Sequence, residues 1–368
     1  MKIMANNLQR QYELYAPEFE HKALEVLRSG WYVLGREVSA FEEEFAAWTG
    51  AKYCVGLASG LDALWISFRL LGIGPGDEVI VSSNAYIACV MSITMNGAAP
   101  VFVESDQYLN MDASAIEKAI TPRTRAILAV HLFGQACDMT EIMRIAEKYG
   151  LQVVEDCAQS HGNHWQGKTV GTFGKIGCFS FYPTKGCGAF GDGGAIVTDD
   201  AELAERFRVF RNYGSEKKYY NSVVGTNSRL DELQAGLLRV RLSHMDELNA
   251  ERCRLAARYS VEIRDPLIRC PEVRPGADST WHQYVIRCEK RDALIEHLKR
   301  NEIGSIIHYP IPPYLSEAYA CLGIPRGSFP YTERAAEEVL SLPMYNGMTE
   351  AEQEHVIRVL NSFSGEAL

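Results

Sequence analysis

Seven short apolar runs, separated by helical patterns, constrain the fold more than any other feature of this sequence. Most of them are rich in Val, Ile and Cys and lack strict polar alternation, which is typical of strands buried on both faces. Strands that alternate with helices in this way predict an α/β fold with a mostly parallel sheet and helices on both faces. The expected strands lie at 52–58, 77–83, 99–104, 125–132, 151–156, 176–182 and 194–199, and the helices between them near 61–71, 86–96, 112–119 and 139–149.

The pattern changes after residue 226. Residues 228–263 form a nearly uninterrupted helical pattern without proline, which leads into a second region. A chain of 368 residues favours about two domains. We therefore expect a large domain at 1–245, including the N-terminal segment, and a smaller C-terminal α/β domain at 246–368. In the smaller domain, strands are expected at 283–288 and 304–309, and helices at 291–301, 332–340 and 349–361.

Charge and cysteine usage narrow the class of protein. The net charge of −10 argues against nucleic acid as the main partner, because a nucleic-acid-binding protein presents a basic face. The ten cysteines are scattered without a CxxC pair, which is typical of reduced thiols in the cytoplasm. The chain shows neither an apolar signal-peptide core nor a run of 18 apolar residues, so no membrane association is expected.

The segment FSFYPTKGCGAFGDGG at 179–194 places Lys185 between an expected strand and a glycine-rich loop. Residues 186–191 also match the dinucleotide fingerprint G-x-G-x-x-G. That fingerprint needs a helix after the glycines, because the N-terminus of the helix binds the pyrophosphate. Here a strand pattern follows, so the context disfavours a nicotinamide cofactor. A nicotinamide-dependent dehydrogenase stays as the alternative with a different cofactor.

Lys185 has three companions at expected strand ends. Asp156 closes one strand, so its carboxylate lies at the carboxyl edge of the sheet, where open α/β sheets bind ligands. Ser59 and Gly60 join another strand to a helix start that suits an anion, and Tyr86 follows a third strand. Taken singly, Asp156 and Ser59 could be helix caps and Tyr86 a core aromatic. Together the four features supply what pyridoxal phosphate needs.

The motifs that carry this pattern resemble the DegT/DnrJ/EryC1/StrS family of nucleotide-sugar aminotransferases, which share the aspartate aminotransferase fold. The resemblance begins at SGWYVLGREVSAFEEEFAAWTGAKYCVGLASGLDAL and continues through HLFGQACDM, VVEDCAQSHG, GCFSFYPTK, GDGGAIVT, RNYGS and NSRLDELQA. It implies a fold type I pyridoxal-phosphate enzyme with a large domain around a mostly parallel seven-stranded sheet. It also implies a homodimer whose active sites are shared between subunits.

The resemblance assigns a role to each cofactor residue. Lys185 would form the internal aldimine and then move protons as general acid and base. Asp156 would pair with the ring nitrogen and keep it protonated, Gln159 would hydrogen-bond the phenolic oxygen, and Tyr86 would stack on the ring. The phosphate would be held by Ser59, Gly60 and Ser180, and by Asn227 from a second subunit.

Substrate contacts are suggested by two further segments. RNYGS and EKKYY at 211–220, together with Arg229, offer cations for a nucleotide diphosphate, although Lys217 and Lys218 could equally form a solvated face. IIHYPIPPYL at 306–315 resembles a segment of aminotransferases that act at C3 of a dTDP-linked 3-keto-6-deoxyhexose. A structural role for this proline-rich loop is the alternative. The substrate-binding candidates are Tyr182, Arg211, Tyr219, Arg229, His308 and Tyr309.

His131 and His161 fall near the same sheet edge, where each is either a functional residue or an internal hydrogen-bonding group. No His, Cys and Asp pattern has metal-ligand spacing, so no metal is expected. The sequence thus predicts a cytoplasmic enzyme that moves an amino group from L-glutamate to a dTDP-3-keto-6-deoxyhexose. The alternatives are a 4-keto aminotransferase, a dehydratase or isomerase on the same fold, and a catalytically idle regulatory or binding protein.

Overall fold

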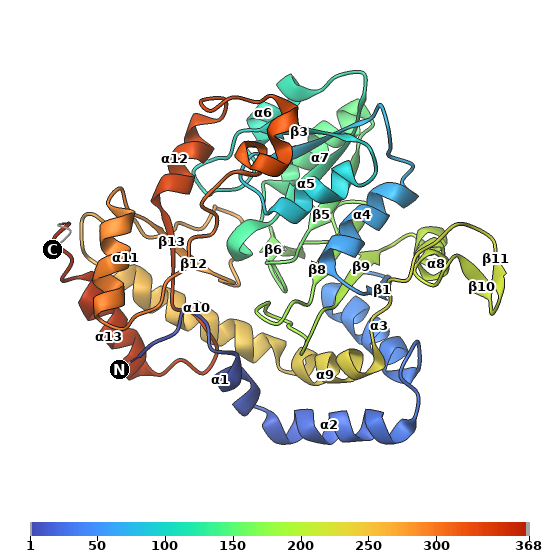
Figure 1. Ribbon diagram of the computed structural model, residues 1–368, viewed down its shortest axis with the longest axis horizontal. Coiled ribbons are helices and arrows are strands. Elements are labelled where there is room, and N and C mark those ends of the chain that lie inside the picture. The colour runs from blue at the N-terminus through green and yellow to red at the C-terminus, as the bar shows by residue number, and fades with distance from the viewer. Residues whose placement is uncertain (1, 366–368) are drawn as a thin grey trace.

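The computed structural model of the protein describes residues 2–365, and a seven-stranded sheet forms its centre (Figure 1). The strand order is β1–β9–β8–β5–β4–β2–β3, with β9 antiparallel to both of its neighbours and the other pairs parallel. All seven expected strands are present, so the prediction of a mostly parallel sheet is confirmed. They are β1 (Tyr53–Leu57), β2 (Glu78–Ser82), β3 (Ala99–Val103), β4 (Thr124–Val130), β5 (Gln152–Asp156), β8 (Ile176–Ser180) and β9 (Gly194–Thr198).

Helices cover both faces of the sheet, and each face has its own apolar core. One core includes buried side chains of α3 (Arg36–Thr49), α7 (Met139–Tyr149) and α9 (Glu232–Ser243), with α6 (Ala113–Ala119) beside them. The other includes those of α4 (Gly60–Leu70), α5 (Ile87–Thr94) and α8 (Ala201–Phe210). The N-terminal helices α1 (Leu8–Glu13) and α2 (Ala16–Ser29) follow each other along the chain, and α2 packs against α9.

The C-terminal region lies beside the sheet, at the left in Figure 1. Its apolar core joins buried residues such as Tyr259, Leu298, Leu340 and Ile357, and Ile3 from the N-terminal segment completes it. The proposed domain boundary at residue 245 stays a prediction. The elements are α10 (Met245–Glu262), β12 (Tyr284–Arg287), α11 (Arg291–Arg300), α12 (Pro330–Glu338), β13 (Val339–Leu342) and α13 (Glu350–Leu360), with β12 antiparallel to β13.

Two expected elements differ from the structure. The strand expected at 304–309 is reduced to a single bridge between Ile306 and Ser341, and prolines that lack an N–H group follow it at 310, 312 and 313. The helical stretch at 228–263 is divided at His244, whose backbone is not helical (φ −108°, ψ 3°). The strand β13 was not expected, because it follows α12 without any breaker residue.

Short elements complete the chain. The hairpin of β10 (Ser215–Lys217) and β11 (Tyr220–Asn221) projects from the end of the molecule opposite the C-terminal region (Figure 1). No helix among the described residues combines the length and hydrophobicity needed to cross a membrane. The other short elements are the hairpin β6 (His164–Trp165) and β7 (Lys168–Thr169), and the 3-10 turns η1 (Leu132–Gly134), η2 (Pro313–Leu315) and η3 (Glu317–Leu322).

Candidate active site

A cavity of about 350 Å³ opens at the carboxyl edge of the sheet, where β4, β5 and β8 end. Ligand sites of open α/β sheets occur at this edge. One wall comes from the loops that follow the strands, and the other from residues 282–283 and 308–309 of the C-terminal region. The cavity brings together ten of the predicted site residues: Ser59, Gly60, Tyr86, Asp156, Gln159, Ser180, Tyr182, Lys185, His308 and Tyr309.

Lys185 enters the cavity from a tight turn directly after β8. Its backbone N–H donates to the carbonyl of Tyr182 at 2.8 Å. A Cβ on Gly188 would lie 2.4 Å from the carbonyl oxygen of Pro183, so this turn needs a glycine. Burial lowers the pKa of Lys185 to about 8, although the nearby Asp156 carboxylate opposes the shift. A larger fraction of this amine is therefore neutral and nucleophilic near neutral pH than of an ordinary lysine.

Asp156 is the last residue of β5 and is buried at the cavity wall. Its Oδ1 accepts the backbone N–H of Ala158 at 3.0 Å, and its Oδ2 accepts the thiol of Cys89 at 3.0 Å. A carboxylate offers about four acceptor positions, so both oxygens can still accept a donor from within the cavity. Asp156 thus provides a fixed acceptor across the same cavity as Lys185.

The start of α4 forms a cradle for an anion. Ser59 caps this helix, with its Oγ accepting the N–H of Asp62 at 3.1 Å. The N-terminal N–H groups and the helix dipole favour a negative group at this end. A Cβ on Gly60 would lie 2.5 Å from the Cβ of Ser180, so only glycine lets the helix start approach β8 this closely.

Aromatic and amide groups also line the cavity that holds Lys185, Asp156 and the start of α4. The rings of Tyr86 and Tyr309 lie 5.3 Å apart between centroids. Gln159 donates through Nε2 to the Tyr309 hydroxyl at 2.9 Å, and its Oε1 accepts the N–H of Phe133 at 2.7 Å. The amide of Gln159 is thereby oriented with its NH₂ group on the side of Tyr309. A flat ring in this space would meet a phenol face and an amide donor.

The sequence also matches the model of a known protein family. The model of the DegT/DnrJ/EryC1/StrS aminotransferase family matches residues 15–361. The chain belongs to this family.

Three similar proteins align with nearly the whole length of this chain. It is 50% identical over 350 residues to the dTDP-3-amino-3,6-dideoxy-alpha-D-galactopyranose transaminase of Aneurinibacillus thermoaerophilus, covering 95% of this chain and 96% of the relative. The crystal structure of S. venezuelae DesV in complex with a ketimine intermediate superimposes with a TM-score of 0.96 at 46% identity, covering 98% of each chain. The pyridoxal-phosphate form of the sugar aminotransferase Spr1654 from Streptococcus pneumoniae has a TM-score of 0.89 at 26% identity, covering 94% of this chain and 95% of that chain. These likenesses confirm the predicted fold type I architecture.

The cavity of this aminotransferase fits pyridoxal phosphate, the cofactor of the family. Ser59, Gly60 and Ser180 line the cavity at the start of α4, where a Cβ on Gly60 would collide with Ser180 and where the helix N-terminus suits a phosphate. Lys185, Asp156 and Gln159 line the same cavity and match the aldehyde, ring nitrogen and phenolic oxygen in chemistry. The enzyme is a pyridoxal-phosphate-dependent transaminase.

Four predicted residues of this aminotransferase do not line its own cavity. Arg211 is buried elsewhere, where its Nη1 pairs with Glu42 and donates to the carbonyl of Gly56 at 2.7 Å. This Nη1 is engaged inside the protein, and the contact of Arg211 with substrate stays a prediction. Arg229 and Asn227 contact Asn212 and the Tyr213 hydroxyl, respectively, each at 2.9 Å. The fourth residue, on the hairpin loop, is Tyr219, which is 85% exposed.

The structure adds residues that the sequence did not single out. Cys89 reaches Asp156 from α5, and His282 and Gln283 line the cavity from the C-terminal region. Burial, followed by the charge of Lys185, lowers the pKa of His282 well below its usual range and that of His308 to about 4. Trp281 and His282 directly precede the strand expected at 283–288, which was the available signal in the sequence for His282.

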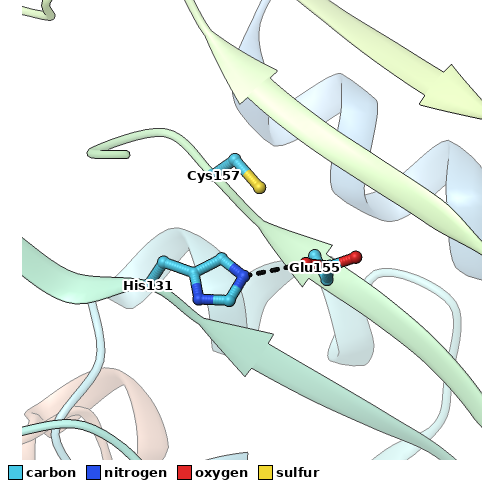
Figure 2. Close-up of side chains that lie close together, drawn as sticks. All are labelled: His131, Glu155 and Cys157. Carbon is cyan, nitrogen blue, oxygen red and sulfur yellow. Dashed lines mark hydrogen bonds and ion pairs between the residues drawn. The ribbon is translucent and has the colours of Figure 1, made fainter. Parts of the chain in front are cut away.

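His131 and His161 are internal hydrogen-bonding groups of different kinds. His161 lies outside the cavity and accepts the N–H of Cys187 through Nδ1 at 2.9 Å. His131 borders the cavity, and its Nδ1 accepts the N–H of Cys137 at 3.1 Å, so the ring hydrogen is on Nε2. That nitrogen donates to Oε2 of Glu155 at 3.0 Å (Figure 2).

Glu155 is fully buried and lies close to His131 and Cys157 (Figure 2). Its Oε2 accepts the N–H groups of His131 and Gly171, and its Oε1 accepts those of Phe173 and Gly174. The four donors use the acceptor capacity of the carboxylate. The cluster therefore ties the loop at 171–174 to the ends of β4 and β5 instead of offering ligands to a metal.

Replacing Glu155 with glutamine is expected to lower the free energy of unfolding by about 2–4 kcal/mol, because an NH₂ group would face buried N–H donors. Urea denaturation of the purified protein measures this loss. The control is Glu296→Gln, an exposed position that pairs with Lys299 and should change stability by less than about 0.5 kcal/mol. Equal stability of both variants would contradict the structural role of Glu155.

The low pKa of Lys185 predicts how fast the apoprotein takes up its cofactor. Only a neutral amine attacks an aldehyde, and the neutral fraction rises as the pH passes the pKa. The rate of pyridoxal phosphate uptake, measured by absorbance, is therefore expected to rise with a midpoint near pH 8, below the ordinary value of 10.5. The same titration with Nα-acetyllysine, whose side-chain amine is free, controls for ionisation of the cofactor. A protein midpoint equal to that of the free amine would contradict the shift.

Proposed function

We propose that the enzyme transfers an amino group from L-glutamate to the keto carbon of a dTDP-linked 3-keto-6-deoxyhexose. The observation that carries this proposal is a single cavity that holds a low-pKa lysine, a buried carboxylate and an anion cradle. The class of sugar is supported by the name of the Aneurinibacillus relative, a transaminase of a dTDP-3-amino-3,6-dideoxyhexose, and by its 50% identity to this chain. The product would be a dTDP-3-amino-3,6-dideoxyhexose.

The residues on the wall formed by the loops that follow the strands would each take one part of the chemistry. When bound, pyridoxal phosphate supplies an aldehyde that takes up amines and an aromatic ring that accepts an electron pair. Lys185 would act as general base and acid, taking up a proton and returning it, which a neutral amine with a pKa of about 8 can do near neutral pH. Asp156 would keep the ring nitrogen protonated, and Ser59 and Ser180 would hold the phosphate.

The C-terminal wall would bind the sugar. His282, His308 and Tyr309 line the cavity from the C-terminal region. Burial, and then the charge of Lys185, lowers the pKa of both histidines, so they are neutral at physiological pH and can accept or donate hydrogen bonds to hydroxyl groups. Tyr182, which lines the same cavity and is 53% exposed, would contact the substrate near the entrance.

A second copy of the chain would complete each site. Asn227, Arg229 and Tyr219 lie outside their own cavity, on the segment that carries the projecting hairpin (Figure 1). In a homodimer, Asn227 would reach the partner's phosphate, and Arg229 the diphosphate of its substrate. Light scattering of the purified enzyme tests this arrangement, because a stable monomer would rule out shared sites.

The function is tested by incubating the holoenzyme with dTDP-linked 3-keto and 4-keto 6-deoxyhexoses, each with and without glutamate, and recording product masses. The expected result is replacement of the keto oxygen by an amine in the 3-keto sugar only, and only with glutamate. Amination of the 4-keto sugar alone would overturn the assigned position. Loss of water without glutamate would indicate a dehydratase. Absence of any reaction with glutamate would overturn transamination by this donor.

A further inference from the structure

We propose that Cys89 is a positioning residue that holds the carboxylate of Asp156 in the orientation needed by the cofactor ring. The proposal depends on the use of pyridoxal phosphate but not on which sugar is aminated. Cys89 Sγ donates to Asp156 Oδ2 at 3.0 Å, and both side chains are buried. The thiol is the one side-chain donor that the described chain directs at this carboxylate.

The first turn of α5 places this thiol. Tyr86 caps the helix, and the backbone N–H of Cys89 donates to the carbonyl of Tyr86 at 3.0 Å. Tyr86 lines the cavity, and Cys89, three residues later, reaches Asp156 at the end of β5. One helix turn therefore supplies the aromatic wall of the cavity and the donor that restrains Asp156.

The two donors to Asp156 act on different oxygens. The N–H of Ala158 is part of the backbone that follows β5 and restrains Oδ1, whereas the thiol comes from another element and restrains Oδ2. A carboxylate held at only one oxygen can rotate about its terminal bond, whose torsional preference is broad. The second bond therefore fixes the plane of the carboxylate before the cofactor arrives, and such preorganisation favours binding.

The protonation of Cys89 suits a permanent donor. Burial, and then the adjacent Asp156 charge, raises the pKa of the Cys89 thiol well above its usual range. The sulfur therefore keeps its hydrogen at neutral pH. A reactive thiolate would instead repel the carboxylate, so this cysteine is suited to hydrogen bonding and not to nucleophilic chemistry.

The test compares side chains that differ only in the donor. Cys89→Ser keeps a donor and Cys89→Ala removes it, while Cys89→Thr and Cys89→Val form a second pair of nearly equal volume. Apoprotein of each variant is titrated with pyridoxal phosphate, and affinity is read from absorbance. The visible spectrum of each saturated variant is then followed with pH. Cys54→Ala, at an equally buried cysteine on β1, controls for the loss of a core sulfur.

Within each pair, the variant without a donor is expected to bind pyridoxal phosphate about tenfold more weakly, because a hydrogen bond to a charged group is lost. The pH midpoint of its spectrum should also move, whereas Ser and Thr should remain near the parent. The Thr and Val pair decides the matter where truncation unfolds the protein. Equal affinities and spectra within both pairs would show that packing alone matters and would overturn the proposal. Failure to aminate any sugar would overturn the proposed function and leave these measurements valid.

Discussion

Replacement of Lys185 with alanine is expected to reduce amino transfer by at least about 10³-fold. The variant lacks both the amine that bonds the cofactor and the group that moves the proton, and proton transfer alone contributes about 10²–10⁴-fold to such reactions. The cradle at Ser59 and Ser180 is unchanged, so the variant should still bind pyridoxal phosphate without a covalent link. Turnover of the keto sugar and the mass of the borohydride-treated protein measure the two effects.

Lys175→Ala is the matched control, because Lys175 pairs with Asp200 away from the cavity and should leave turnover unchanged. Borohydride should fix the cofactor to residue 185 in the parent and in this control, and to no residue in Lys185→Ala. Turnover at the parental rate in Lys185→Ala would exclude Lys185 as the catalytic base. An adduct on another lysine of the parent would have the same consequence.

Asp156→Asn is expected to reduce turnover by about 10²–10³-fold, the usual cost of removing one preorganised electrostatic contact. An amide carries no charge to hold the proton on the ring nitrogen. Its NH₂ group would also face either the Ala158 N–H or the Cys89 thiol, since both carboxylate oxygens accept donors. Initial rates with saturating cofactor measure the effect on chemistry, separately from the effect on cofactor affinity.

Asp292→Asn controls for the loss of one negative charge, because this side chain is 86% exposed on α11 and lies outside the cavity. It should retain the parental rate. A parental rate in Asp156→Asn as well would remove Asp156 from the role that its position indicates. A slow Asp156→Asn variant whose cofactor spectrum is unchanged would likewise show that the ring nitrogen does not depend on this carboxylate.

The strands and their carboxyl ends could be read from the sequence. Runs of β-branched and apolar residues bounded by turn residues favour buried strands through local energetics, and all seven occur where expected. Asp156 and Lys185 directly end or follow such strands, so parallel topology alone places them at one edge. The exception, at 304–309, has strand-forming residues but is followed by prolines and forms only one bridge.

Side chains from distant elements could not be assigned in this way. Arg211 has the chemistry of a substrate cation, but α3 brings Glu42 against it and engages its charge inside the protein. Cys89 is an ordinary apolar residue of a helix pattern until α5 packs against β2 and β3 and brings the thiol to Asp156 at the end of β5. His282 likewise becomes a cavity residue only when the C-terminal region packs beside the sheet.

The sequence by itself determined where the functional residues stand relative to the strands. The aspartate ends a recognisable strand, and the lysine and the serine–glycine turn each follow one. These positions can be read because strand period and turn propensity depend on near neighbours. The tertiary structure alone decided which groups restrain them and which charges are already paired. Those pairings depend on how helices and the C-terminal region pack, and contacts between residues far apart in the chain leave no periodic trace in the sequence.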